Sequence, residues 1–338
     1  MHDLRHAMPT TTVTRRKHRR RGAFGALAGA ALVLSACLGP VTKLDAIAPP
    51  RFAQTSDPAV VRVGGDYYIY GSNNQYRAPI RHVTDINRSY GDISYEGMPT
   101  KPAWTASNIQ LWAPTVGQFG SRWVMFFSAD RPNPPQPDNA QCIGRAWADS
   151  PAGPFTPEPS PVTCGLGGVG GALDPQLLWD ATGAPHLLAA LGNTESPLQS
   201  FPLDGDANIV GEPAVLLSRQ HPWEYHFIEQ PAMIWDPVHN NYILTYSAGK
   251  WWLADYSTGI ARCMSPAGPC YSDPTGPWVS ASAGRTGPGG MSFFYDADGA
   301  PRAILSSFAA GGESTNGGRS ASLMYVKFDP AMALTVVK

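Results

Sequence analysis

Short apolar segments alternate with turn residues along most of the chain from about residue 50 onward. Residues 60–63 (Val-Val-Arg-Val) lead through two glycines and an aspartate into residues 67–70 (Tyr-Tyr-Ile-Tyr), the pattern of a β-hairpin with a glycine-rich turn. Similar units recur, with first segments at 112–116, 174–179, 229–235 and 287–294. No segment shows a convincing amphipathic helical period. Hairpins at this roughly regular spacing predict an all-β fold, a five-bladed β-propeller whose inner strands start at a central channel.

Three carboxyl side chains stand at the start of three of these hairpin units, beside a proline-containing turn. Asp57 and Asp174 are each followed directly by a proline, and Glu229 stands two residues before one. A propeller brings such strand starts together around one axis, so we expect the three acids to lie close together. Grouped carboxyls indicate acid–base chemistry with a polar sugar as substrate. Each Asp-Pro pair taken alone is also an ordinary turn dipeptide.

Composition places the chain among globular proteins. It has 338 residues, of which 43% are hydrophobic and 15% charged, so it can bury a large core and is not disordered. A formal net charge of −1 gives no electrostatic reason to expect a nucleic-acid partner. The 35 glycines and 33 prolines suit many short strands joined by tight turns. We expect a monomer that binds carbohydrate.

The N-terminus has the pattern of an export signal. A basic cluster at residues 15–21 precedes an apolar run, Ala23 to Ala36, which is too short to span a bilayer. The run closes with Leu-Ser-Ala-Cys, which resembles the bacterial lipobox, in which the cysteine, here Cys37, receives lipid and becomes the mature N-terminus. An ordinary secretory signal with an incidental cysteine is the alternative. The arginines also leave twin-arginine export open.

These signals predict the organisation of the chain. We expect a lipoprotein signal peptide at 1–37, a linker at 38–50 and a propeller domain at 51–338. The mature protein would be held at the cell membrane by its lipid, outside the cytoplasm. Secretion without an anchor is the alternative location.

Four cysteines remain after Cys37, an even number that fits an exported chain. They allow three connectivities. We predict the local pairs Cys142–Cys164 and Cys263–Cys270, because each would close a loop within one group of strands in an oxidising compartment. A zinc site is the rival interpretation, but the spacings do not resemble paired C-x-x-C ligands.

Several short stretches are similar, in order and spacing, to one enzyme family. They include Ser-Asp-Pro-Ala-Val and Leu-Trp-Ala-Pro, and they lie at 56–60, 98–114, 148–155, 173–175, 223–231, 246–251 and 256–261. Over about residues 50 to 310 the chain resembles glycoside hydrolase family 43, the five-bladed propellers that include arabinanases, α-L-arabinofuranosidases and β-xylosidases. The resemblance implies cleavage of α-L-arabinofuranosyl or β-D-xylosyl linkages in oligo- or polysaccharide by inverting single displacement.

The resemblance also implies roles for the three acids. Asp57 would be the general base that activates water, and Glu229 the general acid that protonates the departing glycosidic oxygen. Asp174 would orient the acid and raise its pKa. An inverting glycosidase needs two carboxyls about 6.5–9.5 Å apart, with room for water on the far face of the sugar. A third carboxylate nearby disfavours ionisation of the acid and keeps it protonated near neutral pH.

Tryptophans are candidates for stacking on a sugar face. Trp104 and Trp112 fall where the family lines its pocket, and Trp251 follows the proposed acid. Most tryptophans in a propeller are core residues between blades, so packing is the competing interpretation.

The fifth unit departs from the family pattern. Many members carry a channel-facing histidine there that helps to hold a metal ion or its waters, whereas this chain reads Gly287-Pro288-Gly289-Gly290 and has no histidine beyond His239. We therefore expect no metal ligands and no required cofactor, and a structural Ca²⁺ in the channel is in doubt. His186, His221 and His239 fit packing or surface positions. His226 is the one ligand candidate among them, because it stands three residues before Glu229, although a packing position is the competing interpretation.

Two other functions stay open from the sequence. A sugar-binding lipoprotein that kept the propeller and lost turnover would explain the missing histidine, although all three acids survive. A related five-bladed enzyme of the invertase or levansucrase type would use its first acid as a nucleophile and retain anomeric configuration.

Overall fold

A computed structural model describes residues 43, 47–88, 92–106, 111–134, 140–165, 170–192, 197–282, 284–313, 318–329 and 332–337. The chain divides into the units Met1–Gly39 and Pro40–Lys338, and the described residues belong to the second. The predicted signal peptide and Cys37 lie outside the described residues. Within the described part of the chain, no helix has the length and apolar character needed to cross a membrane.

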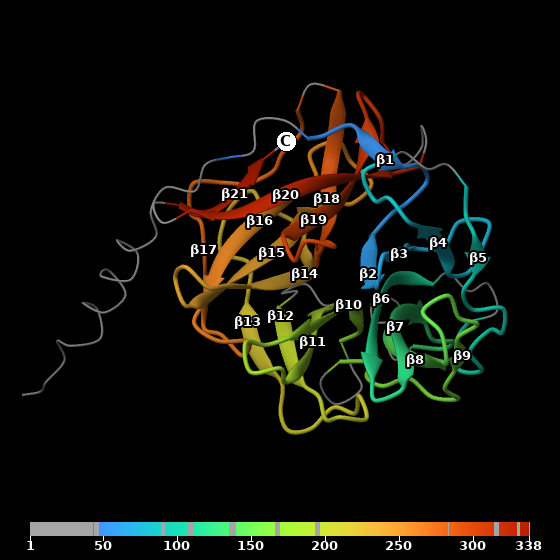
Figure 1. Ribbon diagram of the computed structural model, residues 1–338. Coiled ribbons are helices and arrows are strands. Elements are labelled where there is room, and N and C mark those ends of the chain that lie inside the picture. The colour runs from blue at the N-terminus through green and yellow to red at the C-terminus, as the bar shows by residue number, and fades with distance from the viewer. Residues whose placement is uncertain are drawn as a thin grey trace, which may run out of the picture. The chain divides into compact units, whose positions relative to one another are not determined.

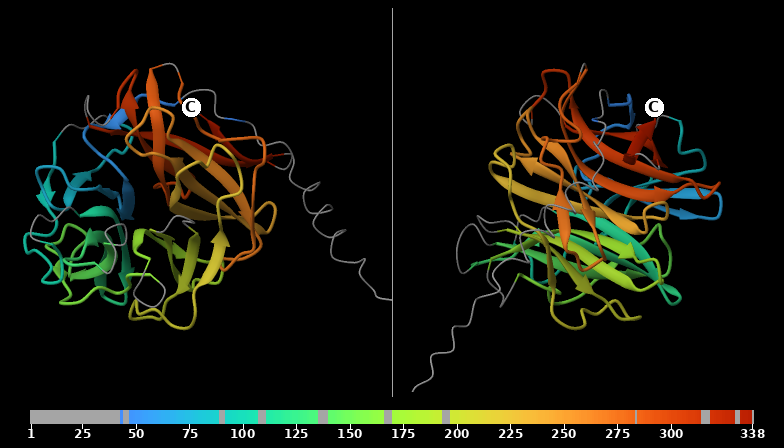
Figure 2. Two further views of the ribbon diagram at one scale, coloured as in Figure 1. Left: turned by 180° about the vertical axis from the view of Figure 1, so that it is seen from behind. Right: turned by 90° about the vertical axis from the view of Figure 1, so that its left-hand side faces the viewer.

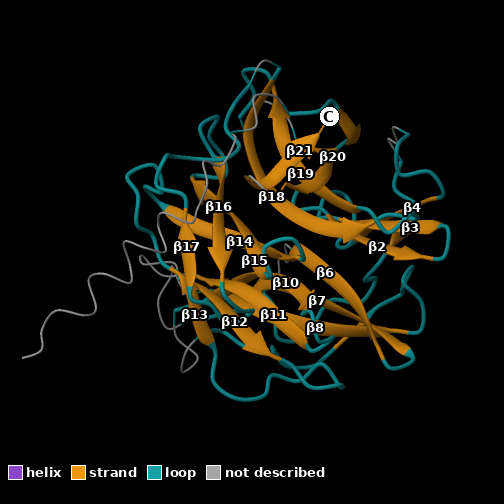
Figure 3. Cartoon of the chain, turned by 60° about the vertical axis from the view of Figure 1, so that its left-hand side comes forward, coloured by secondary structure: helices purple, strands orange, loops and turns teal. Residues whose placement is uncertain are grey.

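Strands and loops account for the described residues, as Figure 3 shows. Four sheets contain four antiparallel strands each, in chain order. Blade 1 comprises β2 (Ala59–Val63), β3 (Asp66–Tyr70), β4 (Pro79–Val83) and β5 (Tyr95–Glu96). Blade 2 comprises β6 (Trp112–Phe119), β7 (Arg122–Asp130), β8 (Gln141–Ala148) and β9 (Thr156–Pro157). Blade 3 comprises β10 (Ala172–Trp179), β11 (Pro185–Leu191), β12 (Leu198–Pro202) and β13 (Ala214–Leu217). Blade 4 comprises β14 (Phe227–Asp236), β15 (Asn241–Gly249), β16 (Ser257–Cys263) and β17 (Cys270–Ser272).

The fifth blade joins the two ends of the domain. It contains β18 (Arg285–Tyr295), β19 (Pro301–Ala309) and β20 (Ser320–Asp329), and β20 pairs with both β21 (Met332–Val337) and β1 (Pro50–Phe52). Strand β1 therefore closes the propeller by completing a sheet built from the other end of the chain (Figure 1). The paired strands β1 and β20 lie at opposite ends of the domain sequence, so no local sequence pattern predicted their pairing.

The end of the segment expected as a linker contacts the propeller. Ile47 is buried among apolar side chains of blades 4 and 5, and Pro50 pairs with Ser322. The Lys43 ammonium donates a hydrogen bond of 2.8 Å to the Thr275 carbonyl. The folded domain thus begins before residue 51, because the closing strand and its approach bury apolar surface.

The sheets are arranged radially around one axis, with the first strand of each innermost (Figure 2). Five clusters of buried apolar side chains in the described residues each lie between two neighbouring blades. Both faces of each sheet are therefore covered near the centre of the propeller. This explains why some strands are continuous apolar runs, whereas others alternate apolar and polar residues. The five-bladed propeller predicted from the sequence is confirmed.

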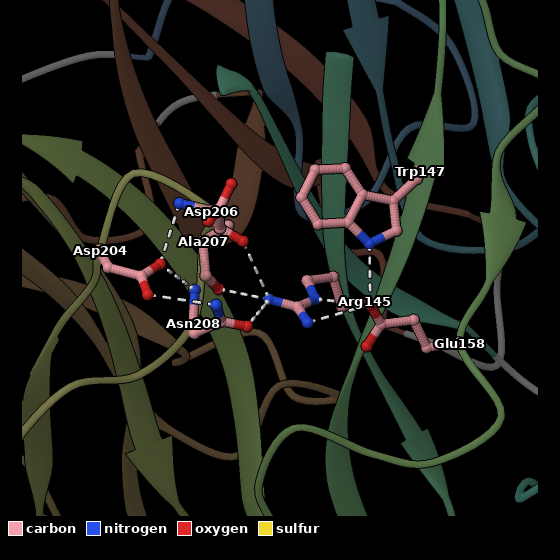
Figure 4. A network of polar contacts seen from close by, with 7 residues as sticks. All are labelled: Arg145, Trp147, Glu158, Asp204, Asp206, Ala207 and Asn208. Carbon is pink, nitrogen blue, oxygen red and sulfur yellow. Dashed lines mark hydrogen bonds and ion pairs between the residues drawn. The ribbon is translucent and has the colours of Figure 1, made fainter. Parts of the chain in front are cut away.

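Polar side chains add a clamp between blades 2 and 3 at the outer rim (Figure 4). Arg145 on β8 donates to the Ala207 carbonyl at 2.6 Å and to the Asn208 amide oxygen at 3.0 Å, both between β12 and β13. The same guanidinium pairs with Glu158 at 2.9 Å, and the Trp147 indole N–H donates to that carboxylate at 2.8 Å. A groove of about 350 Å³ lies beside the clamp. The polar groups of the clamp are hydrogen-bonded to one another.

The two predicted disulfides are present. Cys142 on β8 is bonded to Cys164, and Cys263 at the end of β16 is bonded to Cys270 at the start of β17. Each closes a loop within one blade, as the sequence predicted. Disulfides form and persist in oxidising compartments, which places the folded domain outside the cytoplasm.

Candidate active site

The inner strands of all five blades share one unusual backbone feature. A residue within or just before each inner strand has a positive φ, and these residues are Asp57 (49°), Ala113 (44°), Asp174 (55°), Gln230 (52°) and Gly290 (66°). Four of them are not glycine, and such conformations are costly for other residues and concentrate at functional sites. In four blades a proline follows directly. The left-handed backbone conformation thus recurs at a cavity-lining residue of every blade.

These five residues line one central cavity. With the prolines that follow four of them, and with Gln176 and Met291, they enclose about 20 Å³, room for roughly one water molecule. Asp57 and Asp174 both lie in this lining, whereas Glu229, the residue before Gln230, does not. A cavity of this size cannot hold a sugar ring, so a sugar would have to bind at its mouth.

Serine hydroxyls join neighbouring blades around the cavity. Ser72 Oγ accepts a hydrogen bond of 2.9 Å from the Ala113 N–H, and Ser247 Oγ accepts one of 2.9 Å from the Gly290 N–H. Ser128 Oγ likewise accepts from the Asp174 N–H at 2.8 Å. The cavity-lining residue of each of these inner strands is therefore held by a hydroxyl of the preceding blade.

Asp57 accepts hydrogen bonds on both carboxylate oxygens. Ser72 Oγ donates to Oδ2, and the Gln230 side-chain amide donates to Oδ1. Gln230 reaches Asp57 from blade 4, so the carboxylate is held by donors of its own blade and of a distant one. A half-buried carboxylate held in this way retains lone pairs that can accept a proton from water.

Glu229 is a buried carboxyl with one close donor. Its side chain is 7% exposed, and the Tyr256 hydroxyl donates to Oε1 at 2.6 Å. Burial raises the pKa of Glu229 to about 7, and the charge of Asp57 acts in the same direction, while the hydrogen bond from Tyr256 and the charge of Arg319 oppose the shift. The group therefore keeps its proton into the neutral range, as a general acid must.

Asp174 is as buried as Glu229, and its carboxyl interacts electrostatically with both other acids. Burial raises its pKa well above the ordinary value, and the charges of Glu229 and Asp57 add to the shift. The backbone N–H of Gln230 donates to this carboxyl and opposes the shift. Because Glu229 and Asp174 both hold protons strongly and repel each other as anions, the pair retains a proton at neutral pH.

A buried cation, Arg319, lies beside the acids. Its guanidinium donates to the carbonyls of Gly287 at 2.7 Å and Ser306 at 2.9 Å, and lies over the ring of Tyr256, 5.3 Å from its centroid. Burial lowers the pKa of Arg319, while the negative charges of Asp57 and Glu229 favour its charged form. A fixed positive charge here limits how far burial can raise the pKa of Glu229.

The residues around the cavity do not fit the channel cation that the family resemblance raised. Both Asp57 oxygens face O–H or N–H donors, and a hard cation prefers free oxygen ligands. Among the described residues, no group of three histidine, cysteine, aspartate or glutamate side chains is placed to hold a metal. A Cβ at Gly290 would lie 2.9 Å from Asp57 Oδ1, so a fifth-blade side chain has no room at this point.

The three predicted sugar-stacking tryptophans lie outside the cavity lining. Trp104 stacks on Phe127 with ring centroids 6.1 Å apart and packs against the core between blades 1 and 2. Trp112 is half-buried and directly precedes Ala113 of the lining. Trp251 is 49% exposed, and its carbonyl accepts from Arg319 at 3.2 Å. Trp251 is thus linked to Arg319 by its backbone and Trp112 is a chain neighbour of the lining, while Trp104 packs in the core between blades 1 and 2.

The four histidines considered as ligands contact neighbouring side chains instead of the cavity. His186 contacts Asp180 at 3.3 Å, and His239 contacts Asp236 at 2.7 Å. His221 lies 2.9 Å from Ser272 Oγ. The ring of His226 packs on its neighbour Phe227, and burial lowers its pKa, as do nearby cations.

Sequence reasoning missed Gln230, Tyr256 and Arg319. A signal for Gln230 existed, because the two aspartates and Gln230 all directly precede a proline, whereas Glu229 stands one residue earlier. The register of β14 against β15 shifts between Glu229 and Ala232, which allows both Glu229 and Gln230 to approach the site. Tyr256 begins the stretch 256–261 that resembles the family, but nothing in that stretch marked it as a hydrogen-bond donor to the acid, and Arg319 directly precedes β20 outside all of the similar stretches.

The fold and the site define a β-propeller with an acid-lined centre of the kind used to cleave glycosidic bonds. The family model described as Glycosyl hydrolases family 43 matches residues 51–331, and the chain belongs to this family.

Known proteins of this kind are similar to the chain over different lengths. The extracellular endo-alpha-(1->5)-L-arabinanase of Thermotoga petrophila is 25% identical over 252 residues, 67% of this chain and 52% of that protein. The chain thus spans about half the length of this curated relative.

Solved structures are similar in fold. A thermostable family-43 glycoside hydrolase superposes with a TM-score of 0.72 at 20% identity, covering 89% of this chain and 96% of that one. An exo-1,5-alpha-L-arabinanase from a bovine ruminal metagenomic library gives a TM-score of 0.67 at 22% identity, covering 88% of this chain and 99% of that one. At these identities the likeness supports the fold.

Proposed function

We propose that the protein hydrolyses pentosyl linkages, α-L-arabinofuranosyl or β-D-xylosyl, in oligo- or polysaccharide with inversion of anomeric configuration. The observation that carries the proposal is that Asp57 and Asp174 line one central cavity and the buried carboxyl of Glu229 interacts electrostatically with them, with burial raising the pKa of Glu229 to about 7. Such a centre contains one group that can give a proton at neutral pH and another placed to accept one.

The reaction requires two proton transfers and one displacement. Asp57 takes a proton from water as the water oxygen attacks the anomeric carbon. The bond from that carbon to the glycosidic oxygen breaks, and Glu229 gives its proton to the departing oxygen. Both carboxyls then hold the protonation state opposite to their starting one, and exchange with solvent restores them.

Asp174 serves the acid without touching the scissile bond. Its carboxyl accepts a hydrogen bond from the backbone N–H of Gln230, next to that acid, and the like charges of the two carboxyls disfavour ionisation of both together. Arg319 and Tyr256 act in the opposite direction and hold the pKa of Glu229 near the working range.

Arabinan is the substrate we favour, because the curated relative is described as an arabinanase and one solved structure of similar fold as an exo-arabinanase. We further propose that lipid at Cys37 anchors the enzyme to the membrane and that its polysaccharide is met outside the cytoplasm. The disulfides and the basic, then apolar, N-terminal sequence support this location.

The test is a substrate screen followed by product stereochemistry. The fragment beginning after Cys37 would be assayed on aryl α-L-arabinofuranosides, aryl β-D-xylosides and linear arabinan. Proton NMR of the first product should show the anomer opposite to that of the substrate. Retention would replace single displacement by the double displacement of invertase-type enzymes, and turnover of none of these substrates would favour a sugar-binding protein.

A further inference from the structure

The side chain of Gln230 crosses the centre of the propeller from blade 4 to blade 1. Its Nε2 donates to Asp57 Oδ1, a residue 173 positions earlier in the chain. Its Oε1 accepts from Ser247 Oγ at 3.1 Å and lies 3.3 Å from the Tyr256 hydroxyl. The amide therefore contacts the proposed base on one side and the donor to the proposed acid on the other.

The orientation of this amide is fixed by its neighbours. Ser247 Oγ already accepts the Gly290 N–H at 2.9 Å, so its own proton is free to be donated to Gln230 Oε1. Because Gln230 Oε1 accepts from Ser247, the NH₂ group at the other side of the amide is turned to Asp57. The Gly290 N–H of blade 5 thus sets the direction of the Ser247 hydroxyl. That hydroxyl sets the orientation of the Gln230 amide, so that its Nε2 faces the Asp57 carboxylate.

The second oxygen of Asp57 is also held by a donor whose direction is set by a backbone N–H. Ser72 Oγ accepts the Ala113 N–H at 2.9 Å and donates its proton to Oδ2. Both oxygens of Asp57 are therefore held by donors whose directions are set by backbone amides of other blades. A carboxylate held at two points keeps one orientation toward the mouth of the cavity.

The fifth blade leaves the space that Gln230 uses. At Gly290 a Cβ would lie 2.9 Å from Asp57 Oδ1 and 3.0 Å from Gln230 Oε1, and the residue has a φ of +66°. Any side chain at this position would displace the contact between amide and carboxylate. The glycine and the glutamine therefore complement each other across the channel.

We infer that Gln230 is a positioning residue for the hydrolytic reaction: its amide holds the Asp57 carboxylate in the orientation in which it takes the proton of the attacking water. The inference rests on the proposed role of Asp57 as general base. It assigns to a neutral side chain the task of fixing the base from across the channel. Among the described residues, no group of three histidine, cysteine, aspartate or glutamate side chains is placed to hold a cation that could do so instead.

The test compares Gln230→Ala and the isosteric Gln230→Glu with the matched control Gln118→Ala, an exposed amide on inner strand β6. Gln230→Ala should lower kcat by about 10- to 100-fold, part of the range that general-base catalysis supplies, with KM changed less than about twofold. The loss should be the same for good and poor leaving groups, because the base does not act on the leaving oxygen. The control should match the parent enzyme.

The pH profile separates positioning from a merely structural role. Gln230→Glu places a second carboxylate against Asp57, so the acidic limb of kcat/KM should move to higher pH, since a nearby like charge raises a carboxyl pKa. A structural defect would lower the melting temperature and the active fraction but leave this limb in place. Because Gln230→Glu keeps the size of the side chain, it remains informative if Gln230→Ala does not fold.

Asp57→Asn, measured in parallel, distinguishes the two hypotheses. If Asp57→Asn is inactive while both Gln230 variants keep the parent kcat and the parent acidic limb, the positioning role is overturned and the proposed function stands. If Asp57→Asn remains fully active, the assignment of the base fails, and the positioning role fails with it. The expected pattern is an inactive Asp57→Asn and slowed Gln230 variants with a shifted limb for the glutamate.

Discussion

The Tyr256 hydroxyl donates a hydrogen bond of 2.6 Å to Glu229 Oε1, and the two side chains are 1% and 7% exposed. This bond favours the ionised form of Glu229, whereas burial favours the protonated form and dominates. Burial raises the pKa of Tyr256 well above its ordinary value, and the negative charge of Glu229 adds to this shift. Tyr256 therefore remains a donor at any pH at which the enzyme works.

This relationship predicts the pH dependence of turnover. A general acid must be protonated, so kcat/KM should fall as pH rises through about 7, the raised pKa of Glu229. Tyr256→Phe removes a donor that lowers this pKa, so the basic limb should move to higher pH. Initial rates between pH 4 and 10 check this. A limb that moves to lower pH in Tyr256→Phe would contradict the assignment.

The same shift predicts how stability depends on pH. Because the pKa of Glu229 is raised from 4.5 to about 7 by folding, its contribution to stability is fully present below 4.5 and is lost as pH rises to about 7. Glu229→Gln removes this loss and should be more stable than the parent at pH 8 by on the order of 2–3 kcal/mol. Urea unfolding at pH 4 and 8 measures it. An equal difference at both pH values would show that the charge is not responsible.

The leaving group should separate the roles of two acids. Glu229→Gln should slow substrates with poor leaving groups most, because good leaving groups need little protonation, whereas Asp57→Asn should slow all substrates alike. Losses should reach about 10²- to 10⁴-fold. Rates on a series of aryl glycosides of graded leaving-group pKa give the result. An equal effect of Glu229→Gln on activated and unactivated substrates would show that it is not the acid.

Two glycines with similar backbones provide a test of the crowding at the channel. Gly299 has a φ of +74° and nothing within 4 Å of an added Cβ, so Gly299→Ala should cost about 1–2 kcal/mol of unfolding free energy from the backbone alone. Gly290→Ala adds contact with Asp57 and Gln230 and should cost a further 1–3 kcal/mol or so, together with a loss of kcat. Equal stability of the two variants, with full activity in Gly290→Ala, would mean that the channel is wider than described.

Removal of divalent cations should have little effect. The Asp57 oxygens already accept from Ser72 and Gln230, so a hard cation would have too few free ligands. Dialysis against a chelator should leave both turnover and melting temperature nearly unchanged. A large loss restored by Ca²⁺ would reveal a site built from other oxygens, and substitution of lining residues would then locate it.

Lipid attachment remains a prediction of the N-terminal sequence. Protein extracted from membranes should carry an addition of the mass of a diacylglycerol, and Cys37→Ala should lack it. Intact-mass spectrometry of both proteins gives the answer. Full-length protein recovered unmodified in the medium would instead support an ordinary secretory signal.

The strands and their turns could be predicted because their causes are local. In the first blade the expected segments 60–63 and 67–70 agree with β2 and β3 to within one residue at each end, since alternation and a glycine-rich turn act within a few residues. The disulfide of Cys263 and Cys270 was predictable for the same reason, because the two cysteines are seven positions apart. The type and order of the three acids also came from the sequence, helped by the family resemblance.

Tertiary structure decided which other groups surround those acids. Gln230 meets Asp57, and Arg319 approaches Glu229, only because the propeller closes and β1 completes the last blade. The pKa of Glu229 depends on burial, on the hydrogen bond from Tyr256 and on the charges of Asp57 and Arg319, none of which is encoded near residue 229. Sequence by itself determined the local elements and the reactive residue types, because backbone propensity and side-chain chemistry are local. Their spatial relations depended on contacts between residues far apart in the chain, which the closed ring brings together.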